Sequence, residues 1–241
     1  MLVAVLPSAT AVELKPATVQ AFDTYIRAVE ARLDKQRDSA QFLWVDGTPV
    51  RKDHVRKGEV IAEPWTGNGD VEIKDGLIHD WVGAVFIPGA TLAKTLALVQ
   101  DYDNHKNVYK PEVIDSKLVS RDGNDFHINL RLLKKKVITV VLDTVHEVHY
   151  TPAENGRATS RSHTTRIVEV DKPGEDHGFL WRLNSYWRFQ EKDGGVYVEC
   201  EAISLTRDVP AGLGWLLNPI VRSLPRQSLA NTLRATRDAL R

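Results

Sequence analysis

The chain has 241 residues, of which 32 are basic and 32 are acidic, so its formal net charge is zero. A dedicated nucleic-acid surface needs a basic excess, and we therefore expect no nucleic-acid partner. The single cysteine, Cys200, excludes an internal disulfide and any zinc site built from several cysteines. With 42% apolar residues, the chain is able to bury the core of one large domain, with or without an extension.

The first eleven residues, Met1 to Ala11, form an apolar run that ends in Ala9-Thr10-Ala11. This run resembles the end of a secretory signal with its small-x-small cleavage site, although a positively charged start is missing. We therefore set residues 1–11 apart as the remnant of a signal peptide. We expect an exported protein, periplasmic or secreted, with a cytoplasmic one as the alternative. No apolar run approaches the roughly 18 residues of a membrane span, so no transmembrane segment is expected.

Residues 12–57 are predicted to form a helical extension. A helix over 17–37 follows Pro16, and its apolar stripe consists of Val19, Phe22, Ile26, Val29 and Leu33. Thr48-Pro49 is expected to begin a second, short helix that ends at Lys57. That helix is strongly basic, and we interpret its basic side as a solvated face. Peripheral contact with a membrane surface is the alternative interpretation.

From Val71 the pattern changes to that of β-strands. Val71 to Ile87 alternates around a turn at Asp75-Gly76, and a helix marked by Leu92, Leu96 and Val99 follows. Six further strands are predicted at 113–121, 125–134, 137–150, 158–170, 179–191 and 196–207. The turns between them are recognisable at Asp122-Gly123-Asn124, Asn155-Gly156, Lys172-Pro173-Gly174 and Asp193-Gly194-Gly195, and weak near 134–136. Consecutive strands joined by short turns are expected to pair antiparallel.

The last thirty residues are predicted to contain two helical pieces. A short apolar segment is expected to stop near Pro225, and a longer helix begins there with Ser223 as its N-cap. The apolar stripe of that helix consists of Leu229, Leu233, Thr236 and Leu240. Because the preceding ninety residues offer little besides strands, this stripe is expected to lie on one curved antiparallel sheet.

Strand 179–191 has two chemically different faces. One face carries Phe179, Trp181, Leu183, Trp187 and Phe189, and the other carries Arg182, Asn184, Tyr186, Arg188 and Gln190. A two-residue turn pairs Arg188 near Glu199 and Tyr186 near Glu201. We therefore expect the polar face to satisfy its charges in solvent and the aromatic face to turn inward. The aromatic side chains then either line a pocket or simply fill a core.

The order of strand, helices, six-strand meander and long terminal helix resembles the helix-grip fold of the START-like (SRPBCC) superfamily. Three local stretches carry the resemblance, namely Val85 to Thr91, Asp101 to His105 leading into Pro111-Glu112-Val113, and Ile203 to Pro210. The superfamily includes lipid-transfer START domains, polyketide cyclases and coenzyme-Q-binding proteins. The resemblance implies an α+β domain over 58–241, in which a curved antiparallel sheet of about seven strands wraps the C-terminal helix and encloses a cavity.

The resemblance also implies a hydrophobic or amphipathic small-molecule ligand, such as a lipid, a quinone or a polyketide-like compound. The side chains expected to bind it are Trp81, Phe126, Ile128, Leu130, Trp181, Leu183, Trp187, Phe189, Val198, Leu229 and Leu233. Two alternatives stay open: an enzyme of the cyclase or dehydratase type that uses the same cavity, and a protein-interaction module. If the polar faces of strands 125–134 and 179–191 pointed into the cavity instead, Arg131, Arg182 or Arg188 would meet an anionic head group of the ligand.

No catalytic or metal-binding pattern stands out, and no cofactor is expected. His146-Glu147-Val148-His149 lacks the zincin spacing, because Tyr150 stands where the second histidine belongs. Within one strand His146 and His149 also point to opposite faces. His127, His149 and His163 are interpreted as surface or hydrogen-bonded side chains. We therefore assign no catalytic residue.

Overall fold

The computed structural model describes residues 14–135, 139–170, 180–207 and 214–241, and for 214–222 the backbone alone. The signal-like residues 1–11 and the expected corner at Lys172-Pro173-Gly174 lie outside these ranges, as does Phe179, so export stays a prediction. Within the described part of the chain, no helix is long and apolar enough to cross a membrane.

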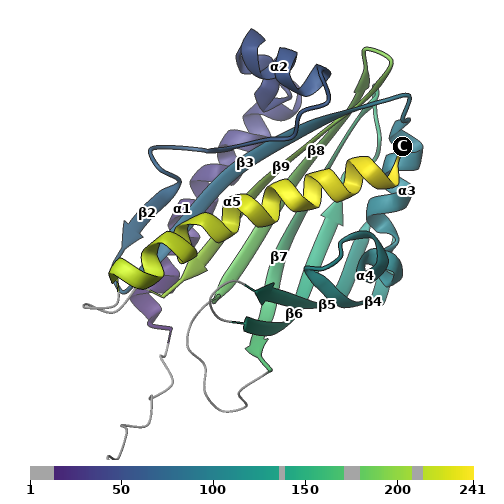
Figure 1. Cartoon of the computed structure of the whole chain (residues 1–241). Helices are drawn as coiled ribbons and strands as arrows, with labels where there is room; N and C mark the ends of the chain where they lie inside the picture. The colour runs from purple at the N-terminus through teal and green to yellow at the C-terminus, as the bar shows by residue number, and fades with distance from the viewer. Residues whose placement is uncertain (1–13, 136–138, 171–179, 208–213) are drawn as a thin grey trace, which may run out of the picture.

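The chain forms one nine-stranded antiparallel sheet with helices on both faces (Figure 1). The helices are α1 (Pro16–Arg37), α2 (Pro49–Arg56), α3 (Leu92–Gln100), α4 (His105–Val108) and α5 (Gly214–Ala239), with 3₁₀ turns η1 (Trp44–Gly47) and η2 (Tyr102–Asn104). The strands are β1 (Ile61–Pro64), β2 (Asp70–Ile73), β3 (Gly76–Pro88), β4 (Val113–Asp122), β5 (Asp125–Lys135), β6 (Thr139–Tyr150), β7 (Arg157–Glu169), β8 (Arg182–Lys192) and β9 (Gly195–Thr206). The α+β helix-grip prediction is confirmed.

The strand order is β1-β3-β9-β8-β7-β6-β5-β4, with β2 paired to β3. The expected seven strands become nine because 71–87 divides into the hairpin β2–β3, and because β1 has only four residues and no clear alternation. Asp75, Asn155 and Asp193 have positive φ angles of 59°, 51° and 57°, at three of the predicted turns. Short polar side chains accept this conformation best among non-glycine residues.

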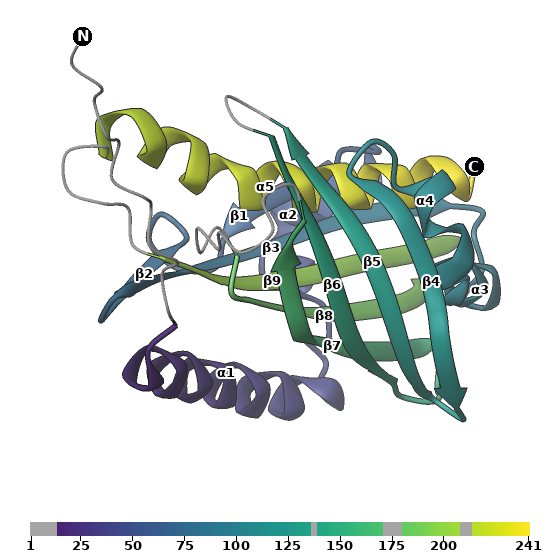
Figure 2. The same ribbon diagram turned by 90° about the horizontal axis from the view of Figure 1, so that it is seen from below.

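Helix α5 crosses the concave face of the sheet, and strands β4–β7 curve up beside it (Figures 1 and 2). Leu229 and Leu233 are buried against β3. A Cβ atom on Gly83 of β3 would stand 2.7 Å from Leu233 Cδ1, so the missing side chain allows the helix to approach this closely. The predicted apolar stripe therefore lies on the sheet as expected.

The predicted break at Pro225 is wrong. Helix α5 runs without interruption from Gly214 to Ala239, so Ser223 is an interior residue and not an N-cap. A proline removes one backbone hydrogen bond and strains the preceding turn, but it does not end a helix whose other contacts hold. Here the following turn is fixed by Leu229 and Leu233 on the sheet.

Helix α1 covers the convex face (Figure 2). Its Phe22 and Val29 pack with Ile203 and Leu205 of β9, and residues 42–45 form a second apolar cluster around Tyr197. Helix α2 begins behind Thr48, as predicted. Its three Arg and Lys side chains and the adjoining Lys57 each have an acidic partner, in the pairs Arg51–Glu63, Lys52–Asp46, Arg56–Asp193 and Lys57–Asp53. This pairing favours the solvated-face interpretation, and a peripheral membrane contact stays an untested prediction.

The polar face of β8 and β9 is not in solvent, which corrects the sequence-based expectation. Arg188 and Glu199 do meet, with Arg188 Nε 3.3 Å from a Glu199 carboxylate oxygen, but both side chains are buried under the N-terminal segment. Glu199 accepts hydrogen bonds from the backbone N–H groups of Trp44 and Val45, each at 2.8 Å. Backbone donors from the distant 3₁₀ turn η1 therefore replace water.

Candidate functional site

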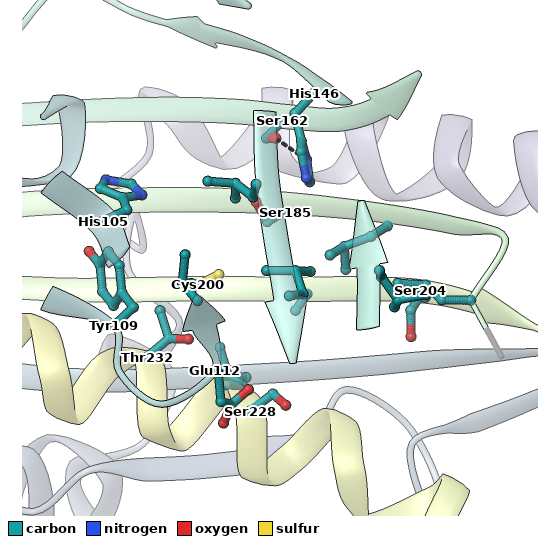
Figure 3. A pocket seen from close by; sticks show the side chains of 18 of the residues that line it. His105, Tyr109, Glu112, His146, Ser162, Ser185, Cys200, Ser204, Ser228 and Thr232 are labelled. Carbon is teal, nitrogen blue, oxygen red and sulfur yellow. Dashed lines mark hydrogen bonds between the residues drawn. The ribbon is translucent and has the colours of Figure 1, made fainter. Parts of the chain in front are cut away.

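A cavity of about 330 Å³ lies between the concave face of the sheet and α5 (Figure 3). It stands at the lower end of the roughly 300–1,000 Å³ typical of small-molecule sites. Its walls come from strands β5 to β9, its roof from Leu224 to Thr232 of α5, and one end from residues 99–113. Most of the side chains that line it are apolar.

Ten of the eleven predicted ligand-binding residues lie on the concave side. Five line the cavity, namely Ile128, Leu130, Leu183, Trp187 and Leu229. Five others, Trp81, Phe126, Phe189, Val198 and Leu233, belong to the apolar core that adjoins it. The placement supports a pocket beside a packed core, and a role of these residues in binding stays a prediction.

Trp181 lies on the opposite face of the sheet. Its ring packs with Phe22 and Val29 of α1, and its backbone N–H donates to the carbonyl oxygen of Leu205 at 2.8 Å. The regular strand β8 begins only at Arg182, so the alternation of faces that we extrapolated to Trp181 does not extend to it.

A hydrogen-bonded group of aromatic side chains closes one end of the cavity, and sequence reasoning did not assign it. Tyr102 donates to the Tyr150 hydroxyl at 2.8 Å, and both Tyr150 and His105 Nε2 donate to the carbonyl of Val99, at 3.3 and 3.1 Å. Tyr109 donates to Thr236 of α5 at 3.3 Å. The spacing of residues 102, 105 and 109 is that of one helical face, and this signal was available in the apparently polar segment 101–110.

These end-wall groups are uncharged near neutral pH. Burial lowers the pKa of His105 to about 4, although the Val99 carbonyl opposes the shift. Burial raises the pKa of Tyr109 to about 12. The pKa values of Tyr102 and Tyr150 are raised by burial as well. This wall therefore carries no net charge, and its hydroxyl and Nε2 donors are already used within the protein.

His146 of β6 is a second buried imidazole on the cavity wall. Its Nε2 donates to the Thr144 hydroxyl at 2.9 Å, since that hydroxyl itself donates to the Leu130 carbonyl. Its Nδ1 accepts from Ser162 at 3.4 Å (Figure 3). Burial, followed by the charge of nearby His163, lowers the pKa of His146 to about 4. His146 is thus a neutral, hydrogen-bonded side chain.

The remaining histidines of these strands lie outside. His149 is exposed and pairs with Asp125 at 2.7 Å, so His146 and His149 point to opposite faces as predicted. His127 and His163 flank Glu147 on the exposed side, at 3.9 and 3.2 Å. Among the residues that the structure describes, no three His, Cys, Asp or Glu side chains are arranged to hold a metal ion.

One ion pair lies at the margin of the cavity, beside α5. Lys134 of β5 contacts the Glu112 carboxylate and donates to Ser228 of α5 at 2.7 Å. Asn231 donates to the other Glu112 oxygen at 2.7 Å. Burial opposes ionisation of Glu112, but the charge of Lys134 and the hydrogen bonds from Lys134, Asn231 and Ser228 together outweigh it and hold the pKa below its usual value. The pair neutralises itself while joining β5 to the helix.

No family model and no curated protein matches the chain in sequence. Solved structures do match in fold. A STAR-related lipid transfer protein from Xanthomonas axonopodis aligns with a TM-score of 0.51 at 18% identity, over 71% of this chain and 98% of its own. An aromatase/cyclase from a Streptomyces species aligns with a TM-score of 0.50 at 11% identity, over 68% of this chain and 93% of its own. The chain therefore has the START-like, SRPBCC helix-grip fold.

Proposed function

We propose that the protein binds a hydrophobic or amphipathic small molecule between the sheet and α5 and carries it unchanged. The observation that supports this most directly is the 330 Å³ cavity, which apolar side chains line and which the packed core adjoins without filling. An apolar hollow of this size gains free energy when it takes up an apolar ligand, since both lose contact with water. Proteins named for lipid transfer and for cyclase activity share the fold, which agrees with a ligand site at this place.

Ala202→Phe is expected to abolish uptake of an apolar probe. Ala202 lines the cavity from β9, directly opposite Ser185 of β8, so a phenyl ring there occupies the space that a ligand needs. Native mass spectrometry of the detergent-free protein, before and after incubation with 1-aminoanthracene, measures the bound mass. The control Ala28→Phe places the same ring on the exposed side of α1. If neither the unsubstituted protein nor the control takes up the probe, the proposal is contradicted.

A cyclase or dehydratase is the second candidate, because two imidazoles and Tyr109 line the cavity. Such an enzyme positions a reactive chain by shape and a few polar groups. A neutral imidazole of low pKa is a weak base, which favours the carrier. Incubation with a short poly-β-keto thioester separates the two. A carrier returns it unchanged, whereas an enzyme that adds a methylene carbon to a ketone and then eliminates the new hydroxyl with a neighbouring hydrogen returns a cyclic product lighter by one water. The variant His146→Ala would lose that product.

An interaction module has less support. The large apolar side chains exposed on the described part of the surface are Val50, Ile114 and Val119. Val50 lies on α2 and the other two lie five residues apart on β4. An interaction module of this fold would instead combine a contiguous apolar patch with a filled interior.

A further inference from the structure

Three serines lie on the cavity wall, one on each of the adjacent strands β7, β8 and β9. They are Ser162, Ser185 and Ser204 (Figure 3). Ser162 stands directly opposite Ser185, and Ser185 stands opposite Ala202, two residues before Ser204 on the same face. Neighbouring strands are about 4.8 Å apart, so the three hydroxyls form a short polar row on a mostly apolar wall, with His146 and Thr206 as further polar side chains that line it.

The hydroxyls of Ser185 and Ser204 have no hydrogen-bond partner among the described residues. Ser162 has one, the long 3.4 Å contact to His146. Ser204 is only 8% exposed, and both hydroxyls belong to residues that line the cavity. Serine is also a poor strand former compared with the β-branched residues that usually fill an apolar sheet face. The row therefore presents hydrogen-bonding groups to the cavity that the protein itself leaves largely unused, and polar atoms of a ligand would use them.

The surroundings of the row carry no uncompensated charge. His146 at its end is neutral, and burial raises the pKa of the Cys200 thiol beside it, which keeps that thiol protonated. Glu112 and Lys134 at the margin neutralise each other. An ionised ligand group would lose its hydration in such a cavity without gaining an opposite charge. A hydroxyl or carbonyl oxygen would instead find hydrogen-bonding partners in the row.

We propose that Ser185 and Ser204, with Ser162 beside them, recognise an uncharged ligand that carries hydroxyl or carbonyl oxygens on an apolar skeleton. This inference rests on the proposed function, and it specifies the class of molecule that the cavity accepts. It disfavours free fatty acids and other anionic amphiphiles, whose head group would have to be buried against neutral donors.

Two naphthalene probes of similar size test it. Prodan is an uncharged ketone whose emission shifts to the blue when its carbonyl loses a hydrogen bond, and 1-anilinonaphthalene-8-sulfonate is an anion. We expect prodan to bind more tightly than the sulfonate. We also expect the double variant Ser185→Ala, Ser204→Ala to bind prodan about tenfold more weakly and with blue-shifted emission, since one or two net hydrogen bonds are lost. Ser120→Ala, an exposed serine on β4, serves as the matched control.

The outcomes separate this inference from the proposed function. Prodan binding that the double variant leaves unchanged in affinity and in emission would overturn the role of the serines while ligand binding stands. Tighter binding of the sulfonate would overturn the uncharged ligand class. If prodan, the sulfonate and 1-aminoanthracene all fail to bind, the cavity takes no ligand and both proposals are wrong.

Discussion

Leu233→Asp is expected to unfold the protein or to leave it with a small fraction of its stability. Leu233 is fully buried, and its Cδ1 atom lies where α5 approaches Gly83 of β3 most closely. Removing a buried leucine costs about 2–5 kcal/mol, and an unpaired carboxylate at the same place adds a desolvation penalty. Domains of this kind are stable by only about 5–15 kcal/mol. Urea unfolding followed by far-UV circular dichroism measures the loss.

The matched control is Arg234→Asp, which places the same residue one position further along α5 on the exposed side. Both variants place aspartate in the same turn of the helix, and the control changes the charge near the helix C-terminus by two units instead of one. A larger loss for Leu233→Asp than for the control therefore reports burial. We expect a loss below about 1 kcal/mol for the control. Equal unfolding midpoints for the two variants would show that the helix presents a different face to the sheet.

Raising the pH from 5 to 8 is expected to destabilise the protein through Asp80, and Asp80→Asn should remove that dependence. Asp80 lies fully buried on the convex face of β3. It accepts a hydrogen bond from Tyr25 of α1 at 2.7 Å and lies next to Glu201, whose own partner is Arg32. Two carboxyl groups thus share one cation. Burial, followed by the charge of Glu201, raises the pKa of Asp80 to about 7.

The sign of the effect follows from proton linkage. The pKa of the Asp80 carboxyl is 3.8 in the unfolded chain and about 7 in the folded protein. Between these two pH values the folded state holds a proton that the unfolded state has lost. This contribution is fully present below pH 4 and disappears as the pH rises through 7. Three pKa units correspond to about 4 kcal/mol at most.

Urea unfolding at pH 5, 6, 7 and 8 measures this dependence. The unsubstituted protein should lose a few kcal/mol of unfolding free energy between pH 5 and pH 8 that Asp80→Asn does not lose. The difference between the two proteins should therefore shift by that amount in favour of the variant. Asp23→Asn, on the exposed side of α1, controls for the loss of one carboxylate. Parallel pH profiles for the unsubstituted protein and Asp80→Asn would contradict the shared-cation arrangement.

Much of the fold was predictable because its signals are local. Strand alternation, the turn residues Asp75, Asn155 and Asp193, and the stripe of Leu229 and Leu233 each act within a few residues. Two errors came from over-weighting such signals. Pro225 marks a helix end in most contexts, yet α5 continues through it, and the four-residue strand β1 is held by pairing with β3 and not by its own composition.

The convex layer was not predictable from local pattern. Alternation assigned Arg188, Glu199 and Glu201 to a polar face, and polar faces are usually solvated. Their partners in the N-terminal segment are helix α1 and the 3₁₀ turn η1, more than 100 residues earlier in the chain, and those contacts leave no periodic signal. The serine row was missed for the opposite reason: its members are in phase with the inward residues Leu183, Trp187 and Cys200, but a search for apolar residues passes over them.

Strand β9 is a wall between two different interiors. Its even-numbered residues Cys200, Ala202 and Ser204 face the cavity, and its odd-numbered Glu199 and Glu201 face the charged layer under α1. A slip of one residue in its pairing would exchange the two sets, placing two carboxylates in the cavity and removing the acceptors of Arg32 and of the Trp44 backbone. The chemical contrast between the two faces therefore specifies the register of β9 strongly. One out-of-register strand would remove the apolar lining of the cavity and the acidic partners of the N-terminal segment together.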